Sequence, residues 1–154
     1  MRLSTRSRYG VRAIFDMAYH SGGLPTQIKA ISKRQEITPR YLEQIFQKLK
    51  RAGIVQSIRG PKGGYYLARK PGKIAVGDVI RAVEEPMGVV FCTLPARGRK
   101  KCRRESTCIA QIVWQEAASR LLKYFDSMSI EKLCKMAKEM GIEKQLDHRF
   151  MYFI

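Results

Sequence analysis

Acidic residues are scarce in this sequence, and their scarcity limits what the protein can do. Thirteen Asp and Glu stand against 30 Lys and Arg among 154 residues, which leaves a formal net charge of +17. The imbalance is strongest over residues 1–77, which hold 16 bases and three acids. With two histidines and few carboxylates, the chain has little material for general acid–base catalysis, so we expect it not to be an enzyme. Such a charge favours a polyanionic partner, with nucleic acid ahead of a membrane.

Long apolar runs are also missing. No uninterrupted hydrophobic stretch approaches the ~20 residues that a membrane span requires. The opening residues 1–6 lack the apolar region of a signal peptide. We therefore expect a cytoplasmic protein that does not enter a membrane. Hydrophobic residues still make up 45% of the chain, which is enough to build a folded core.

Apolar periodicity predicts a mainly α-helical fold with one small β-hairpin. Helices are expected over 7–20, in a short segment capped by Thr26, and over 39–52, 76–83, 106–128 and 129–140. Residues 54–59 and 65–68 read as two antiparallel strands joined by a glycine-rich turn. Three helices followed by a hairpin with a basic tip are typical of a winged helix-turn-helix domain, which we assign to residues 1–85.

The third helix is the best-defined functional element. Thr38 is a favourable N-cap residue, and Pro39 suits the first helical position. The opposite face carries Arg, Gln and Tyr side chains that can bond base edges, together with Lys and Arg that neutralise phosphates. A solvated polar face is the alternative, but the short helix before it and the basic hairpin after it favour DNA binding. The apolar stripe consists of Leu42, Ile45, Phe46 and Leu49.

The hairpin tip provides a second candidate contact. Arg59 and Lys62 flank glycines that let the backbone approach a phosphate ridge or a minor groove without a Cβ clash. A plain hairpin turn is the alternative. The complete set of predicted DNA-binding residues is Arg2, Ser4, Thr38, Arg40, Tyr41, Gln44, Lys48, Arg51, Arg59, Gly60 and Lys62.

Three of the four cysteines are grouped. Cys92, Cys102 and Cys108 are spaced C-x9-C-x5-C, and the segment from 87 to 105 has no helical or strand period. Thiolates bind soft metals and iron–sulfur clusters, and we expect Cys108 in the first turn of a helix, where a thiolate is favoured. Zinc sites more often contain C-x2-C pairs, so an iron–sulfur cluster, a structural zinc ion and free redox-sensing thiols all stay open. Cys134, beside Leu133 on the apolar face of the last helix, is expected to be a buried structural thiol.

The long helix expected after Ser106, an N-cap residue type, has one apolar stripe and no intrachain partner of equal length. Pairing with its own copy across a two-fold axis would bury this stripe, so we expect a homodimer. The domain assignment then continues with a cysteine-containing loop over 86–105, a dimerisation helix over 106–128, and a C-terminal helix and tail over 129–154. The stripe consists of Ile109, Ile112, Val113, Ala117, Leu121, Tyr124 and Met128.

Several motifs resemble one known family. They are Met1-Arg2-Leu3, Tyr41-Leu42-Glu43-Gln44-Ile45-Phe46, Ser57-Ile58-Arg59-Gly60-Pro61-Lys62-Gly63-Gly64-Tyr65 and Ala75-Val76-Gly77-Asp78-Val79-Ile80. Over roughly residues 1–125 the chain is similar to the Rrf-type winged-helix transcriptional regulators, which include the IscR-like and NsrR-like iron–sulfur cluster sensing repressors. The resemblance implies a homodimeric transcription factor that binds a two-fold operator in double-stranded DNA. It also implies a [2Fe–2S] or [4Fe–4S] cluster, held by Cys92, Cys102 and Cys108, that controls DNA binding.

The chain departs from the family pattern around the cysteines. The segment between the first two cysteines is longer than usual and carries extra bases, and the histidine that completes the cluster in IscR-like members is Gln111 here. The acid that NsrR-like members take from the partner's first helix corresponds to a position near Arg8. The fourth ligand therefore stays open among Glu105, His20, His148, Cys134, a water molecule and a small molecule.

Overall fold

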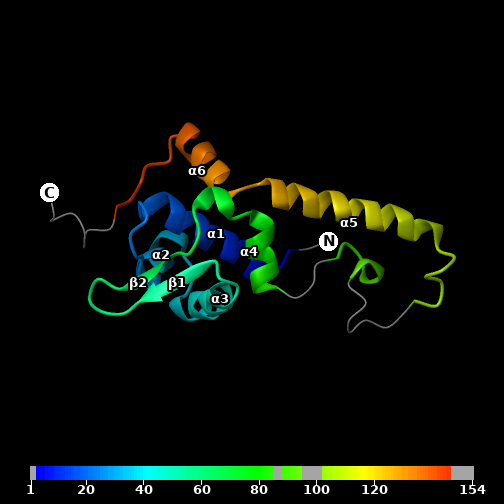
Figure 1. Cartoon of the computed structure of the whole chain (residues 1–154), viewed down its shortest axis with the longest axis horizontal. Helices are drawn as coiled ribbons and strands as arrows, with labels where there is room; N and C mark the ends of the chain where they lie inside the picture. Colours follow the sequence, from blue (N-terminus) through cyan, green and yellow to red (C-terminus); the bar gives the residue numbers. More distant parts are fainter. Residues whose placement is uncertain (1–2, 85–87, 95–101, 147–154) are drawn as a thin grey trace.

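A computed structural model describes residues 3–84, 88–94 and 102–146 of the chain. Helices α1 to α4 and the hairpin form one body, α6 lies against α1, and α5 extends away from it (Figure 1). The prediction of a mainly helical fold with a hairpin wing is confirmed. The elements are α1 (Thr5–His20), α2 (Ile28–Gln35), α3 (Pro39–Arg51), β1 (Val55–Ile58), β2 (Gly64–Leu67), η1 (Pro71–Lys73), α4 (Val76–Val83), η2 (Phe91–Thr93), α5 (Ile109–Ser127) and α6 (Ile130–Glu139).

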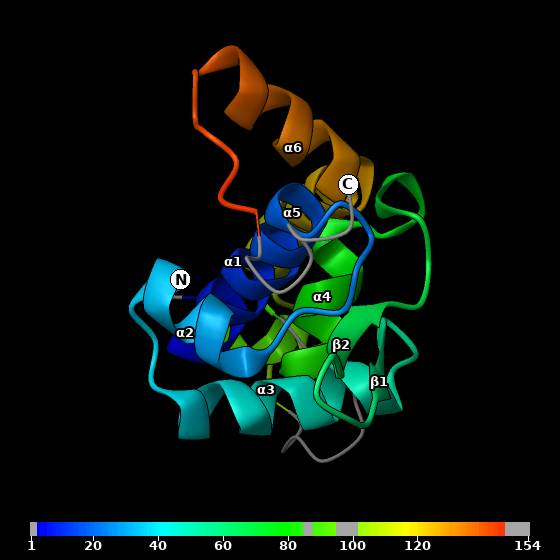
Figure 2. The same ribbon diagram turned by 90° about the vertical axis from the view of Figure 1, so that its left-hand side faces the viewer.

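The core lies where α1, α3 and α4 meet. The four apolar residues predicted for the third helix, from Leu42 to Leu49, are all fully buried. α3 ends at Arg51 with Ala52 as its C-cap, and Gly53 follows with a φ of 69°, which suits a glycine after a helix end. α1 supplies Ala13, Ile14 and Met17 from its inner face. Because the apolar stripe of α3 faces this core, its polar face is directed outward, at the lower edge of the molecule in Figure 2.

The hairpin pairs Val55 with Leu67 and Ile58 with Gly64 in antiparallel register. A third segment joins its edge, since the backbone N–H and C=O of Thr26 both bond Tyr65, at 2.7 and 2.8 Å. Thr26 was expected to cap the second helix. That expectation is wrong, because Gln27 precedes α2 and Thr26 is used in the sheet. A Cβ on Gly64 would lie 2.5 Å from the Thr26 carbonyl oxygen, so this edge pairing requires a glycine.

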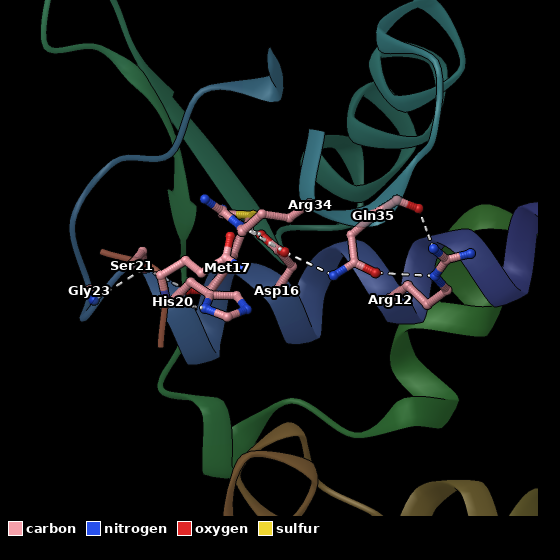
Figure 3. Close-up of polar contacts among 9 residues, drawn as sticks. Arg12, Asp16, Met17, His20, Ser21, Gly23, Arg34 and Gln35 are labelled. Carbon is pink, nitrogen blue, oxygen red and sulfur yellow. Dashed lines mark hydrogen bonds and ion pairs between the residues drawn. The ribbon is translucent and has the colours of Figure 1, made fainter. Parts of the chain in front are cut away.

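A buried ion pair joins α1 to α2 (Figure 3). Asp16 is completely buried, and the Arg34 guanidinium donates to both of its carboxylate oxygens, the shortest bond being 2.6 Å. Gln35 Nε2 donates to the same carboxylate at 2.9 Å, and Gln35 Oε1 accepts from Arg12 Nε at 3.1 Å. The network therefore fixes the end of α2, from which the chain turns through Glu36, with φ of 53°, into α3.

The second half of the chain differs from expectation at the start of α5. This helix begins at Ile109 with Cys108 as its N-cap, not at Ser106. α6 begins as expected, with the Ser129 hydroxyl accepting from the Lys132 N–H at 3.2 Å. Met140, the C-cap of α6, is 75% exposed. Among the described residues, no helix combines the length and the apolar character needed to cross a membrane.

Candidate nucleic-acid interface and cysteine loop

The outward face of α3 presents most of its predicted DNA contacts to solvent. Arg40, Gln44 and Arg51 are exposed, whereas Tyr41 and Lys48 are half-buried. The Lys48 ammonium donates to the carbonyl oxygen of Val83 at 3.2 Å, so it anchors α3 to the end of α4. Thr38 is exposed and precedes the helix, but within the described part of the chain its hydroxyl makes no capping hydrogen bond.

An open groove separates α3 from the wing. Gln47 and Glu43 line it from the helix, and Ile58, Gly60 and Tyr65 line it from the hairpin. Glu43 was not among the predicted contacts, although its place one residue before Gln44 on the polar face was a usable signal. The groove thus offers an amide, a carboxylate and backbone groups side by side, a mixed donor and acceptor set suited to base edges.

The wing tip is exposed and its backbone is shaped by glycine. Arg59, Gly60 and Lys62 are all exposed, and Gly60 has φ of 111°. A Cβ on Gly63 would overlap the Ile58 carbonyl oxygen, so the tip closes only with glycine there. The tip therefore holds two cations beside a backbone that other groups can approach closely.

The amino-terminal end of α1 lies beside the start of α3. The Ser4 hydroxyl caps α1 by accepting from the Ser7 N–H at 3.2 Å, and the Ser4 N–H donates to Glu84 at 3.1 Å. Tyr9 contacts Tyr41 edge to face, with ring centroids 5.7 Å apart, and this contact holds the first turn of α3. Arg2, the remaining predicted DNA contact, lies outside the described residues.

The three grouped cysteines are free thiols, and two of them lie in η2 or next to α5. Cys92 lies in η2, which packs against α5, and Cys108 is the N-cap of α5; both are half-buried, whereas Cys102 is exposed. Cys108 was expected two positions after an N-cap at Ser106, within the first turn, but the N-cap position that it occupies is at the same positive end of the helix dipole. No group of three or more metal-binding side chains is gathered among residues 3–84, 88–94 and 102–146.

The candidates for a fourth ligand lie in different environments. Gln111 is 8% exposed in the first turn of α5. His20 is buried at the end of α1, where its Nδ1 accepts from the Gln145 N–H at 2.9 Å, and burial lowers its pKa. Cys134, expected to be buried, is half-buried and packs against the core, and burial raises the pKa of its thiol. The N–H of Glu105 donates to the Cys102 carbonyl, and His148 lies outside the described residues.

α5 exposes large apolar side chains along the predicted stripe. Ile109 is 79% exposed, Ile112 63%, Val113 59% and Tyr124 57%. Met128, the last member of the stripe, differs because it packs against the core of the body. The exposed apolar residues therefore extend along α5 from its first residue, Ile109, to Tyr124 in its last turn.

Comparison with known proteins accounts for this combination of elements. Residues 3–136 match the model of the Rrf2 family, described as iron-dependent transcriptional regulators. The chain belongs to the Rrf2 family. An Rrf2-family chain is a helix-turn-helix, DNA-binding transcriptional regulator and not an enzyme, as the scarcity of acids predicts.

Individual relatives of this Rrf2 chain include several regulators named IscR. The chain is 37% identical over 147 residues to IscR of Xenorhabdus nematophila, covering 96% of this chain and 87% of the relative. It is 41% identical over 133 residues to IscR of Aliivibrio salmonicida, covering 86% and 77%. The solved structure of T. potens IscR matches with a TM-score of 0.75 at 34% identity, covering 94% of each chain. CymR, the global cysteine regulator of B. subtilis, matches with a TM-score of 0.70 at 32% identity, covering 88% and 98%.

Proposed function

We propose that this Rrf2-family protein is a cytoplasmic, homodimeric repressor whose affinity for a two-fold operator is controlled by an iron–sulfur cluster. The observation that carries the proposal is that three free thiols lie in η2, in the segment before α5 and at the N-cap of α5, in a chain 37% identical to an IscR protein. Four positions on the described α3 and wing support its DNA-binding half, because Arg40, Gln44, Arg51 and Arg59 are exposed on neighbouring elements.

The DNA contacts divide into two kinds. Gln44 and Arg40, on the middle and start of α3, are proposed to read base edges in the major groove, with Tyr41 and Thr38 beside them. The cations proposed to neutralise phosphates are Arg2, Lys48, Arg51, Arg59 and Lys62. Ser4 and Gly60 are proposed to offer polar groups to the sugar–phosphate backbone of the DNA. Lys48 is the weakest member of the set, because its ammonium already bonds the Val83 carbonyl.

Cys92, Cys102 and Cys108 are proposed to hold the cluster. The donor set fits, since thiolates are the usual ligands of iron–sulfur clusters and all three thiols are free. The N-cap position of Cys108 and the nearby bases Arg103 and Arg104 favour an anionic group there. When bound, the cluster supplies a redox-active group whose presence signals the iron–sulfur supply. We propose Gln111, buried in the adjacent turn, as a wall of the site and not as a ligand.

Dimerisation is proposed to use α5. A helix whose outer face is apolar and exposed buries this face when it pairs with its own copy. In a two-fold dimer both copies bury the same apolar surface. A two-fold protein in turn requires a two-fold DNA site.

A regulator that holds no cluster is the second candidate, with a structural zinc ion or free redox-sensing cysteines. Two observations favour it: no three metal ligands are gathered among the described residues, and the fold is also similar to CymR. Anaerobic purification separates the candidates. A brown protein that absorbs in the visible and contains iron and sulfide supports the cluster, and a colourless protein contradicts it; Mössbauer spectra would then assign the nuclearity.

Gln44→Ala tests the recognition helix. We expect the variant to bind its operator, first identified by selection from random sequences, about 1–3 kcal/mol more weakly, because one base contact is lost. The affinity of Gln44→Ala for random DNA should change little. The control is Gln115→Ala, which removes an exposed glutamine from α5 and should leave the affinities for operator and for random DNA unchanged. Equal losses on operator and random DNA would show that Gln44 does not read bases. Fluorescence anisotropy measures all four affinities.

Arg59→Ala tests the wing. We expect lower operator affinity and a salt dependence, the slope of log K against log[salt], that is shallower by about one, because one phosphate contact is lost. The variant should fold normally, since Arg59 is exposed at a hairpin tip. Lys138→Ala, which removes an exposed cation from α6, should leave the slope unchanged. An unaltered slope in Arg59→Ala would exclude this contact.

A further inference from the structure

The junction between the DNA-binding body and α5 is rigid in its main chain. The Val76 N–H donates to the Met128 carbonyl oxygen at 2.8 Å, and the Ile130 N–H donates to the Ile74 carbonyl oxygen at 2.9 Å. These bonds pair the residues before α4 with the residues that follow α5. Main-chain hydrogen bonds, and not a flexible linker, therefore hold the carboxyl end of α5 against the body.

A side-chain contact one turn away fixes the direction in which α5 leaves this junction. Arg81 of α4 pairs with Asp126 of α5 at 2.7 Å and with Asp78 of its own helix at 3.0 Å. Asp78 in turn accepts from the Ala75 N–H at 3.0 Å, so the guanidinium bridges the start of α4 and the end of α5. These side chains are about half exposed, so the pair contributes little to stability and its effect is on geometry.

Gly77 allows the two helices to approach this closely. A Cβ at position 77 would overlap Oδ1 of Asp126 and lie 3.1 Å from its Cγ. Any larger residue must displace the carboxylate, and with it the ion pair to Arg81. A glycine inside a helix is unfavourable by itself, so its position opposite Asp126 indicates a role in this contact.

The direction of α5 matters because the helix acts as a lever. Its 19 residues span about 28 Å at ~1.5 Å per residue. A change of about 10° at the junction moves the far end by about 5 Å, which exceeds the rise of one base pair, about 3.4 Å. In a dimer joined along α5, the same change would move one recognition helix relative to the other.

We infer that Gly77, Arg81 and Asp126 form a clamp that sets the spacing between the two operator half-sites that the dimer accepts. The inference rests on the proposed function, because it needs a dimer joined through α5 and a two-fold operator. The three residues are positioning residues. They lie on α4 and α5, outside the predicted DNA-binding set, and act through the direction of α5.

Asp126→Ala is the first test, on a panel of operators whose half-sites are moved by one or two base pairs in either direction. We expect the wild-type protein to lose about tenfold in affinity for each base pair of displacement, because the two half-sites shift and rotate relative to each other. In Asp126→Ala this loss should fall to about threefold or less. Affinity for DNA with a single half-site and the melting temperature should both match wild type. Glu131→Ala, which removes an exposed acid paired with Lys135 on α6, should keep the wild-type profile.

Gly77→Ala tests the same clamp from the other helix. It should relax the spacing requirement as Asp126→Ala does, and the double variant should relax it no further, because both changes break one contact. If both single variants keep the wild-type spacing profile, the clamp is overturned while the proposed function stands. If the wild-type protein is monomeric or accepts all spacings equally, the proposed function fails, and the clamp fails with it.

Discussion

Cys108→Ser is expected to yield a protein that stays colourless after anaerobic purification, whereas we expect the wild-type protein to be brown. The serine hydroxyl is a harder, less easily ionised ligand, and the site offers few thiolates. Cys92→Ser and Cys102→Ser should have the same effect, because each removes one of the same three proposed ligands. Visible absorption and the iron and sulfide content per chain are the measurements. Operator affinity should change in these variants while the helical content measured by circular dichroism does not, since the winged-helix body contains no cysteine up to residue 84.

Cys134→Ser is the matched control for this series. Its thiol packs against the core on α6, so we expect the cluster to remain. If Cys134→Ser bleaches the protein as fully as Cys108→Ser, then Cys134 is the fourth ligand and its placement as a structural thiol is wrong. Gln111→Ala should leave the colour unchanged, whereas Gln111→His should slow the loss of the cluster in air.

Val113→Lys is expected to dissociate the dimer. Val113 lies on the exposed apolar stripe of α5, and pairing would enclose two ammonium groups, one from each copy, in an apolar seam. We expect dimerisation to weaken by about 100-fold or more, close to ~3 kcal/mol. Sedimentation velocity at micromolar concentration measures the change. The monomer should bind a two-fold operator far more weakly than wild type but a single half-site equally well, because it loses only the second contact.

Gln115→Lys provides the control, because it adds the same charge to the same helix. Position 115 is exposed but lies about 200° around the helix from position 113, away from the stripe. It should therefore leave a dimer. A Val113→Lys protein that sediments as a dimer would place the dimer interface elsewhere on the chain.

Local signals made α3 predictable from the sequence. Pro39 at the first helical position, the buried series from Leu42 to Leu49 and Gly53 after the end all agree with one another, and the structure confirms each. The start of α5 was less predictable. An N-cap preference is worth about 1 kcal/mol, too little to place a helix start at Ser106 when η2 packs against the helix three residues later.

Contacts between residues far apart in the sequence were beyond sequence reasoning. Nothing near Lys48 indicates that its ammonium would bond the carbonyl of Val83, and nothing near Thr26 indicates an edge pairing with Tyr65. The contact of Gly77 with Asp126 likewise depends on how α5 folds back onto α4. Spacing could group the cysteines, but their arrangement in space depends on where η2 lies.

The ion pair between Asp16 and Arg34 constrains how this fold can diverge. Because Asp16 is completely buried, replacing either partner alone leaves the other charge buried without its counter-ion. This lowers the free energy of unfolding by about 3–5 kcal/mol. That loss is a large share of the stability of a small domain. Replacing both residues together with apolar side chains of similar volume removes the stranded charge and carries little cost. Single mutational steps away from the pair therefore pass through a poorly folded intermediate, so we expect the two positions to change together among relatives even though they lie 18 positions apart in the sequence.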